Sequence, residues 1–161
     1  MYCVLFVCTA NKCRSPTAEG VFRHFVTEAD LAARIGSDSV GLSANHVGEP
    51  PDRQALLAAR ARGFEIGDLR ARQITMQDFR DFQLILAMDS SHYQQLVRSC
   101  PPGAKEKIAM FLDAAPHFGR MDVPDPYAGS LVDFDYTLDL IEAGARGWLN
   151  QIRAARFQRR Q

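Results

Sequence analysis

The N-terminal segment constrains the fold more than any other part of the chain. Residues 2–7, Tyr-Cys-Val-Leu-Phe-Val, form a continuous apolar run that ends at polar residues, which is typical of a strand buried on both faces of a parallel sheet. Residues 16–27 have apolar side chains at helical spacing, and Ser15 and Pro16 supply an N-cap and a first helical position. A buried strand joined to a helix by a short polar loop begins a βαβ unit.

The rest of the chain continues the same alternation. Further strands are predicted at residues 38–43, 84–88 and 107–111, and further helices at residues 53–62, 90–98 and 131–157, with a loop over residues 116–129. With 161 residues, the chain has the length of one ordinary domain. We therefore predict a single α/β domain over residues 1–161, with a doubly wound, four-stranded parallel sheet and helices on both faces.

Charge and hydropathy exclude several classes of protein. Lys+Arg and Asp+Glu both number 19, so the formal net charge is zero, which argues against a protein held to nucleic acid or to an anionic membrane by bulk charge. No apolar run approaches the roughly 20 residues of a membrane span, and the N-terminus lacks the pattern of a signal peptide. We expect a cytoplasmic protein whose cysteines are reduced.

The polar loop at residues 8–15, directly after the first strand, is the predicted site. Ligands of doubly wound folds bind at the carboxyl ends of the strands, and a loop that leads into a helix can turn its amides toward an anion. Cys8 and Arg14 lie at the two ends of this loop, and Arg14 could bind an oxyanion through two parallel hydrogen bonds. The helix N-terminus and the guanidinium favour the thiolate of Cys8, which would be a nucleophile toward phosphorus, and Ser15 could donate to its sulfur.

Both parts of this interpretation have alternatives. A Cys-x5-Arg spacing also occurs by chance, in which case Cys8 fills the core at a strand end and Arg14 is a solvated cation. Asp125, followed by Pro126, could supply the general acid that a leaving group needs, but Asp-Pro is also a common turn dipeptide. The loop amides and Arg14 can compensate the charge of a bound phosphate, so no metal or other cofactor is expected.

Five segments together resemble the low-molecular-weight protein tyrosine phosphatase family. They are VCTANKCRSPTAEGVF at 7–22, NHVGEPPD at 45–52, RARQIT at 70–75, DFQLILAMD at 81–89 and VPDPYAG at 123–129. The resemblance implies that Cys8 attacks the phosphorus of phosphotyrosine, that Arg14 binds the equatorial oxygens and that Asp125 protonates the leaving oxygen. A phosphocysteine would form, and Asp125 would then activate the water that hydrolyses it.

The resemblance also implies roles for the residues around the nucleophile. The substrate-binding residues that it implies are Thr9, Ala10, Asn11, Lys12, Cys13, Arg14, Ser15, Asn45 and Tyr127. Asn11 would hold the loop in a strained shape with Ser39, which otherwise reads as a turn residue at a strand end. Asp89 matches a family position near the loop, or it caps a helix. Cys13 is either a redox partner that forms a reversible disulfide with Cys8 or a small buried residue.

The chain departs from the family pattern at several positions. Ala10 replaces the usual Gly, which would cost about 1 kcal/mol if the position needs a positive φ. Lys12 replaces a small or apolar residue and would either extend over the pocket mouth or be solvated. Asn45 replaces an aromatic wall residue and Ala128 replaces a second tyrosine, so that Tyr127 alone remains to flank a phenyl ring.

Three other functions fit the same loop. A protein-arginine phosphatase belongs to the same family, but Lys12 would repel its guanidinium leaving group. An arsenate reductase needs a pair of cysteines after the third strand, where only Cys100 is present. A phosphopeptide-binding module would need neither a nucleophile nor an acid. The resemblance also suggests a tyrosine kinase as the phosphoprotein partner, with inorganic phosphate or another oxyanion bound by the loop.

Overall fold

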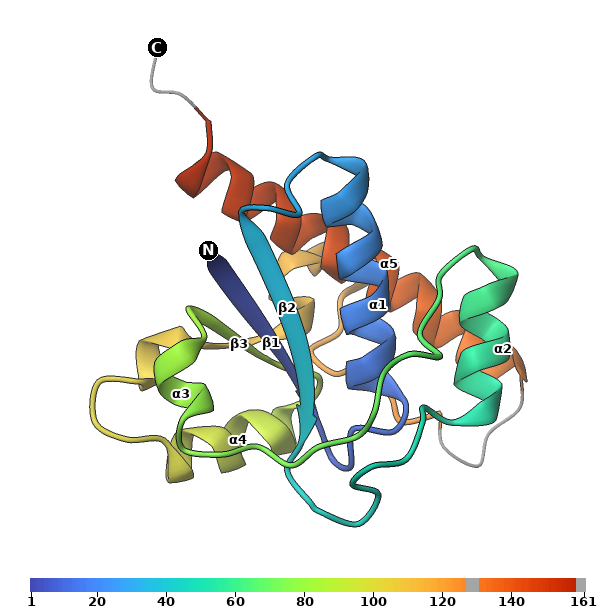
Figure 1. Cartoon of the computed structure of the whole chain (residues 1–161), viewed down its shortest axis with the longest axis horizontal. Coiled ribbons are helices and arrows are strands. Elements are labelled where there is room, and N and C mark those ends of the chain that lie inside the picture. Colours follow the sequence, from blue (N-terminus) through green and yellow to red (C-terminus); the bar gives the residue numbers. More distant parts are fainter. Residues whose placement is uncertain (127–130, 159–161) are drawn as a thin grey trace.

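The computed structural model describes residues 1–126 and 131–158, which form one parallel sheet with helices on both faces (Figure 1). The strands are β1 (Tyr2–Cys8), β2 (Ile35–Gly41), β3 (Leu84–Ala87) and β4 (Ile108–Met110), and the helices are α1 (Arg14–Glu28), α2 (Arg53–Ala61), α3 (Asp78–Asp81), α4 (Ser90–Ser99) and α5 (Leu131–Arg156). Three 3-10 turns lie at η1 (Lys105–Lys107), η2 (Phe111–Ala114) and η3 (Pro116–Phe118).

The sheet has the strand order β2-β1-β3-β4, and all of its neighbouring strands are parallel. Side chains alternate along the central strand β1: Val4 and Phe6 belong to the core shared with α1 and α5, whereas Leu5 and Val7 belong to the core shared with α3 and α4. Because both faces are covered, β1 can be apolar throughout. The predicted doubly wound α/β fold is confirmed.

The boundaries of several elements differ from the predictions. β2 begins at Ile35 and ends at Gly41, because it pairs with β1 residue by residue over this whole length. The prediction of residues 38–43 found only its second half, because the polar residues in the middle of β2 interrupt the apolar pattern. α3, η1 and η2 were not predicted, and η3 lies inside the segment that was predicted to be a loop. These pieces are short, so they have no periodicity from which to infer them.

The start of α1 corrects the predicted cap. The helix begins at Arg14, and its N-cap is Cys13, which makes no capping hydrogen bond through its side chain. Ser15 therefore lies inside the first turn rather than before it. Its buried hydroxyl instead makes hydrogen bonds with the Cys8 sulfur, the Asn11 side-chain amide and the Val40 carbonyl. The first turn of α1 thus points its amides at the loop without a capping side chain.

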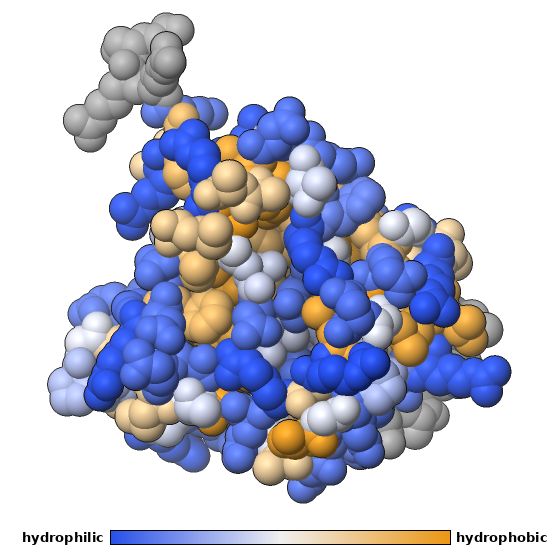
Figure 2. Space-filling model, viewed as in Figure 1, coloured by the Kyte–Doolittle hydropathy of each residue, from blue (hydrophilic) through white to orange (hydrophobic). Residues whose placement is uncertain are grey.

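The surface shows no single large apolar face in the view of Figure 2, where hydrophilic residues predominate and apolar ones form small separate patches. None of the helices in the described residues combines the length and apolar character that crossing a bilayer requires.

Candidate active site

The loop between β1 and α1 lies at the carboxyl edge of the sheet and forms one side of a cavity of about 210 Å³. The cavity is lined by Cys8, Thr9, Ala10, Lys12, Cys13, Arg14, Asn45, His46 and Asp125. The structure therefore brings together the three predicted catalytic residues from segments that are far apart in the sequence. Asn11 and Ser15 were also predicted to bind substrate, but their side chains are buried behind the loop. Tyr127 and Ala128 lie outside the described residues.

Cys8 is the last residue of β1 and is 3% exposed. Its Sγ lies 3.0 Å from the Oγ of Ser15. The Ser15 oxygen accepts a hydrogen bond from the Nδ2 of Asn11 at 2.9 Å, so the serine proton is available to donate to the sulfur. A hydroxyl that donates to sulfur stabilises a thiolate more than a thiol, which favours a nucleophile at this position.

Arg14 begins α1, and its guanidinium is almost fully buried beside the cavity. Its Nη1 donates to Asp89 Oδ2 at 2.8 Å and to the Val123 carbonyl at 3.0 Å, while Nη2 lies 3.5 Å from both Thr9 Oγ1 and Asp125 Oδ2. These contacts come from three segments and fix the plane of the guanidinium. A fixed, planar cation suits bidentate binding of an oxyanion.

Asp89 combines the two roles that the sequence left open. It is the N-cap of α4, where its carboxylate accepts from the His92 amide, and it also pairs with Arg14. Burial alone would raise the pKa of Asp89, but hydrogen bonds from Ser91, from the His92 amide and from Arg14 hold that pKa below its usual range. Asp89 is therefore a charged counter-ion that anchors Arg14.

Asp125 lies at the mouth of the cavity, where its side chain is 51% exposed. The segment that leads to it is tied to the end of β3: the amide of Val123 donates to the Met88 carbonyl at 2.9 Å, and the Asp122 carboxylate accepts from the amide and hydroxyl of Ser90. Hydrogen bonds at Asp122 and Val123 thus fix the segment just before Asp125. This places the Asp125 carboxyl within reach of a ligand bound against Arg14.

The shape of the loop depends on Asn11, which has a left-handed conformation with φ 56°. Asparagine tolerates this conformation better than most residues. Its Nδ2 donates to Ser15 Oγ and to Ser39 Oγ at 2.9 Å each, and its Oδ1 accepts from the amide of Arg72 at 3.0 Å. Ser39 therefore does contact Asn11, from within β2 rather than from a turn. Ala10 is not among the residues of positive φ, so the strain expected there does not arise.

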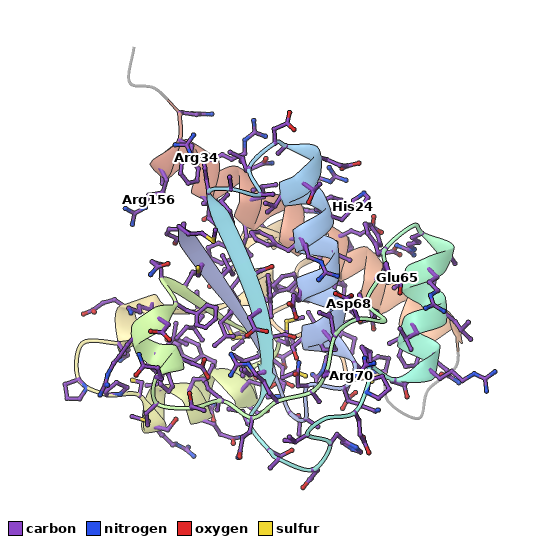
Figure 3. All side chains as sticks on the ribbon, in the orientation of Figure 1. His24, Arg34, Glu65, Asp68, Arg70 and Arg156 are labelled. Carbon is purple, nitrogen blue, oxygen red and sulfur yellow. The ribbon has the colours of Figure 1, made fainter. Side chains whose placement is uncertain are left out.

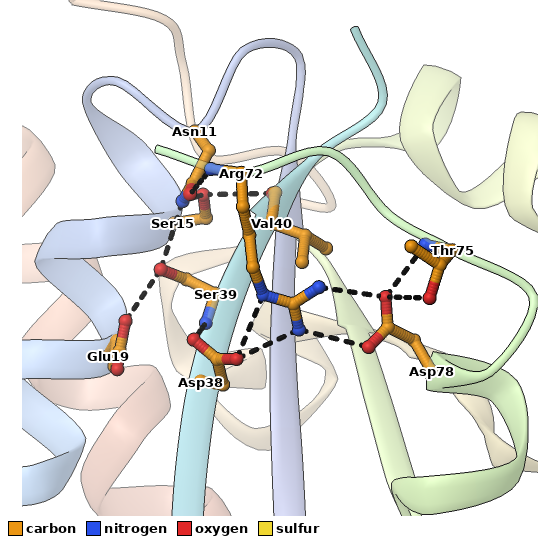
Figure 4. Close-up of polar contacts among 9 residues, drawn as sticks. All are labelled: Asn11, Ser15, Glu19, Asp38, Ser39, Val40, Arg72, Thr75 and Asp78. Carbon is orange, nitrogen blue, oxygen red and sulfur yellow. Dashed lines mark hydrogen bonds and ion pairs between the residues drawn. The ribbon is translucent and has the colours of Figure 1, made fainter. Parts of the chain in front are cut away.

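Arg72 and Gly41 support the loop from behind, and neither was singled out from the sequence. The Arg72 guanidinium pairs with Asp38 at 2.8 Å and with Asp78 at 2.9 Å (Figure 4). These pairs hold the segment whose backbone reaches Asn11. At Gly41, an added Cβ would lie 2.6 Å from the carbonyl carbon of Ala10. The signal that could have revealed Gly41 is a glycine at the end of a strand beside the loop.

His92 is a buried histidine that the sequence analysis also missed. Burial, with Arg14 acting in the same direction, lowers the pKa of His92 to about 4, although Asp89 opposes the change. The neutral ring accepts from the Asp89 amide at Nδ1, so its Nε2 carries the proton and donates to Thr9 Oγ1 at 2.9 Å. His92 thus connects α4 to the loop between β1 and α1.

Lys12, Asn45 and His46 form one wall of the cavity. Lys12 is not simply solvated: its Nζ donates to the Pro50 carbonyl at 2.6 Å and lies 3.4 Å from Glu49. Glu49 also contacts His46 Nδ1 at 2.5 Å. His46 was missed, although it directly follows Asn45.

Cys13 is buried, lines the same cavity as Cys8 and is a free thiol. Burial, together with nearby Asp52 and Cys8, raises the pKa of Cys13 far above its usual range. Cys13 is therefore protonated at neutral pH. Among the described residues, no group of three or more His, Cys, Asp or Glu side chains is placed to hold a metal ion.

Comparison with known proteins agrees with this geometry. The sequence model of the family described as "Low molecular weight phosphotyrosine protein phosphatase" matches residues 3–158. The chain belongs to this family. A low molecular weight protein-tyrosine-phosphatase of Streptomyces coelicolor is 39% identical over 94% of each chain. The low molecular weight phosphotyrosine protein phosphatase of Homo sapiens is 37% identical over 82% of this chain and 84% of its own.

A solved structure extends the similarity to the backbone. The protein tyrosine phosphatase of Entamoeba histolytica, crystallised with Hepes in the active site, superposes with a TM-score of 0.93 and is 30% identical. The comparison covers 98% of this chain and 100% of that one. As a member of the low-molecular-weight family, the protein is a protein-tyrosine-phosphatase, a hydrolase of phosphoric monoesters.

Proposed function

We propose that this phosphatase hydrolyses phosphotyrosine in protein substrates through a phosphocysteine intermediate on Cys8, without a metal ion. The observation that carries the proposal is that a thiol, a guanidinium and a carboxyl, from Cys8, Arg14 and Asp125, line one cavity of about 210 Å³. A nucleophile, an anion-binding cation and a proton donor are the three groups that this reaction needs.

In the first step the Cys8 sulfur attacks phosphorus, an S–P bond forms, and the bond from phosphorus to the phenolic oxygen breaks. The Asp125 carboxyl gives its proton to that oxygen, which leaves as tyrosine. In the second step water attacks phosphorus, its proton passes to the Asp125 carboxylate, and the S–P bond breaks. Ser15, 3.0 Å from the sulfur, stabilises the departing thiolate.

Charge on the transferred phosphoryl group is balanced by the protein itself in this proposal. Arg14 supplies a cation that is fixed by Asp89 and Val123, and the first turn of α1 adds its amides and its helix dipole. Together they provide the stabilisation that metal ions provide in kinases.

The wall of Lys12, Asn45 and His46 is the surface that a substrate ring would meet. We propose that a phenyl ring lies against it, because this wall offers a planar imidazole whose orientation is held by Glu49. We also propose a cytoplasmic setting, which the composition favours, and a tyrosine kinase among the substrates, which the family resemblance suggests.

Cys13 is proposed as a redox partner of Cys8. A peroxide would oxidise the Cys8 thiolate to a sulfenic acid, the Cys13 sulfur would displace water from it to form a disulfide, and an external thiol would reduce that disulfide. Both cysteines line one cavity, which supports the pairing.

The test is hydrolysis of an aryl phosphate in the presence of EDTA. We expect full activity with the chelator, near-total loss in Cys8→Ser, and normal activity in the matched control Cys100→Ser, which changes a cysteine at the end of α4. Relative to the wild type, Asp125→Ala should slow turnover most for esters with poor leaving groups such as phenols, and equal slowing for all leaving groups would count against Asp125 as the general acid. Activity that survives Cys8→Ser would overturn the mechanism.

The related functions are separated by competition. Phosphotyrosine and phosphoarginine peptides, offered together, report which leaving group the enzyme accepts. We expect phosphotyrosine to be preferred, because the Lys12 cation lies in the wall of the cavity. Thioredoxin-dependent reduction of arsenate, or tight phosphate binding without turnover, would instead favour the reductase or the binding module.

A further inference from the structure

Glu19 is a buried carboxyl that the proposed reaction does not use. It lies on α1, one turn after Ser15, and is 6% exposed. Burial raises the pKa of Glu19 to about 7; a hydrogen bond from Ser39 acts against burial, Asp38 and Asp68 act with it, and Arg23 acts against it.

No cation in the described part of the chain forms an ion pair with Glu19. Arg23 lies on the same helix, but its guanidinium donates to the carboxylate of Asp68 at 3.0 Å. Asp68 lies in the segment that runs beside α1 (Figure 3). A buried carboxyl without a cation destabilises a fold. An apolar side chain would pack here at lower cost, so packing alone does not account for Glu19.

A continuous series of hydrogen bonds joins Glu19 to the nucleophile. Ser39 Oγ donates to Glu19 Oε2 at 2.6 Å, Asn11 Nδ2 donates to Ser39 Oγ at 2.9 Å and to Ser15 Oγ at 2.9 Å, and Ser15 Oγ lies 3.0 Å from Cys8 Sγ. Figure 4 shows Glu19, Ser39, Asn11 and Ser15 in this order, between α1 and the edge strand β2.

The direction of the hydrogen bonds made by Asn11 is determined. The amide of Arg72 can only donate, so the atom of Asn11 that it contacts is Oδ1, and Nδ2 must face the two serines. Each serine oxygen therefore accepts from Asn11 and has its own proton left over. Ser39 gives its proton to Glu19, and Ser15 gives its proton to Cys8 or to the Val40 carbonyl.

We propose that Glu19 is a positioning residue for catalysis at Cys8: by accepting the Ser39 proton, its carboxyl keeps Ser39 as an acceptor for Asn11, and Asn11 keeps Ser15 as a donor to the sulfur. The inference rests on the proposed function, since the step that Glu19 serves is the attack by Cys8 and its later departure. Without an acceptor at position 19, the Ser39 hydroxyl proton can turn toward the Asn11 Nδ2, which donates to the same Ser39 oxygen. Asn11 then loses one of its two hydrogen bonds to serine side chains.

The test compares Glu19→Met, which removes the acceptor, with Glu19→Gln, which keeps an acceptor oxygen. For Glu19→Met we expect kcat to fall by about tenfold, the effect of losing roughly one net hydrogen bond, with KM little changed. The melting temperature should change little, because removal of a buried carboxyl without a cation offsets the loss of its hydrogen bond from Ser39. Glu19→Gln should recover most of kcat. Glu28→Met, an exposed site on the same helix, is the matched control and should change neither quantity.

Two further measurements separate a positioning role from a structural one. In a Ser39→Ala background, Glu19→Met should lower kcat no further, because Ser39 is the residue through which Glu19 acts. The alkylation rate of Cys8 by iodoacetamide, followed by peptide mass spectrometry, should also fall in Glu19→Met. This rate does not depend on phosphatase activity, so it tests Glu19 even if the proposed function fails.

The proposal is overturned if Glu19→Met keeps normal kcat and normal alkylation of Cys8. It is equally overturned if kcat falls only as far as the folded fraction falls, or if the losses from Glu19→Met and Ser39→Ala add in full.

Discussion

The floor and the wall of the cavity are built differently. By the floor we mean Cys8 and Arg14, which line the cavity, together with Asn11 and Ser15, which support them from behind the loop; none of the four is more than 4% exposed. On the wall, the exposed fraction of the side chain is 18% for Lys12, 32% for His46 and, at the mouth, 51% for Asp125. The floor residues are held by partners from β2, from the segment before α3 and from the segment that leads to Asp125. Lys12 and His46 instead share one exposed carboxylate, that of Glu49.

This difference separates the chemistry from substrate recognition. Buried hydrogen bonds and charge pairs are costly to break one partner at a time, so the floor tolerates little change. Exposed ion pairs contribute about 0–1 kcal/mol each, so the wall can change with little effect on the fold. We expect substitutions in the floor to affect kcat or stability strongly, and substitutions in the wall to affect KM modestly.

Arg14→Lys should have the largest effect. Lysine keeps the charge but loses the planar fork that contacts Asp89 and Val123 while binding an oxyanion. We expect kcat for an aryl phosphate to fall by about a thousandfold, equivalent to about 4 kcal/mol. Steady-state kinetics measures this, and circular dichroism verifies the fold. A loss below tenfold would mean that the floor needs only a positive charge.

The buried His92 should make stability depend on pH. Its pKa is about 4 in the folded protein and about 6.5 in an unfolded chain, so unfolding takes up a proton between these values. Stability is therefore complete above pH 6.5 and falls as the pH drops toward 4, by up to about 3 kcal/mol.

Urea unfolding of the wild type and His92→Gln at pH 7.5 and pH 4.5 checks this expectation. The variant lacks the titrating group, so the difference in stability between the two proteins should shrink at the lower pH. A constant difference would show that His92 does not titrate with unfolding.

Gly41→Ala should disturb the floor from behind. The added Cβ would lie within 3 Å of the backbone of Ala10 and Asn11, so the loop must move. We expect a loss of about 1–3 kcal/mol of stability, as for an overpacked site, with a lower kcat. The control is Ser99→Ala, at the exposed end of α4. A second glycine such as Gly103 would not serve, because its positive φ would strain an alanine whatever the space around it. Unchanged kcat in Gly41→Ala would show that the loop has room to adjust.

His46→Ala should have the smallest effect. It removes the planar wall and the contact with Glu49 without touching the floor. We expect KM for an aryl phosphate to rise by about threefold, equivalent to less than 1 kcal/mol, while kcat stays within a factor of two. His46→Phe should restore the KM. A fall in kcat of the size expected for Arg14→Lys would remove the distinction between wall and floor.

The sequence predicted the fold because its strongest patterns are local. The apolar run at residues 2–7 marks a strand covered on both faces, and residues 131–157 show a long amphipathic stripe; both elements are present, and α5 ends at Arg156. β2 was placed less well, since Ser37, Asp38 and Ser39 interrupt its apolar pattern. Ser39 contacts Asn11 and Asp38 holds Arg72, so two of these polar residues support the loop and the poorer prediction follows from that role.

The candidate site was predictable for the residues with reactive side chains. Cys8, Arg14 and Asp125 were singled out by their chemistry and by the resemblance, and the structure places them around one cavity; their catalytic roles stay a proposal. Arg72 and His92 could not be found from the sequence, and Gly41 gave only the weak signal of a glycine at the end of a strand. Their contribution depends on which backbone atoms lie beside them, and local patterns do not contain that information. Glu19 was read only as part of a helix for the same reason.

The contacts of Asn11 have a consequence for how the chain acquires activity as it folds. Ser39 is 28 residues away from Asn11 along the sequence, and Arg72 is 61 residues away. The loop therefore cannot take its final shape when β1 and α1 first form; it must wait until β2 has paired with β1 and the following segment has crossed behind it. Contacts between such distant residues form late, because the intervening chain must first lose its freedom. During refolding, helical circular dichroism should return before the ability to cleave a phosphate ester.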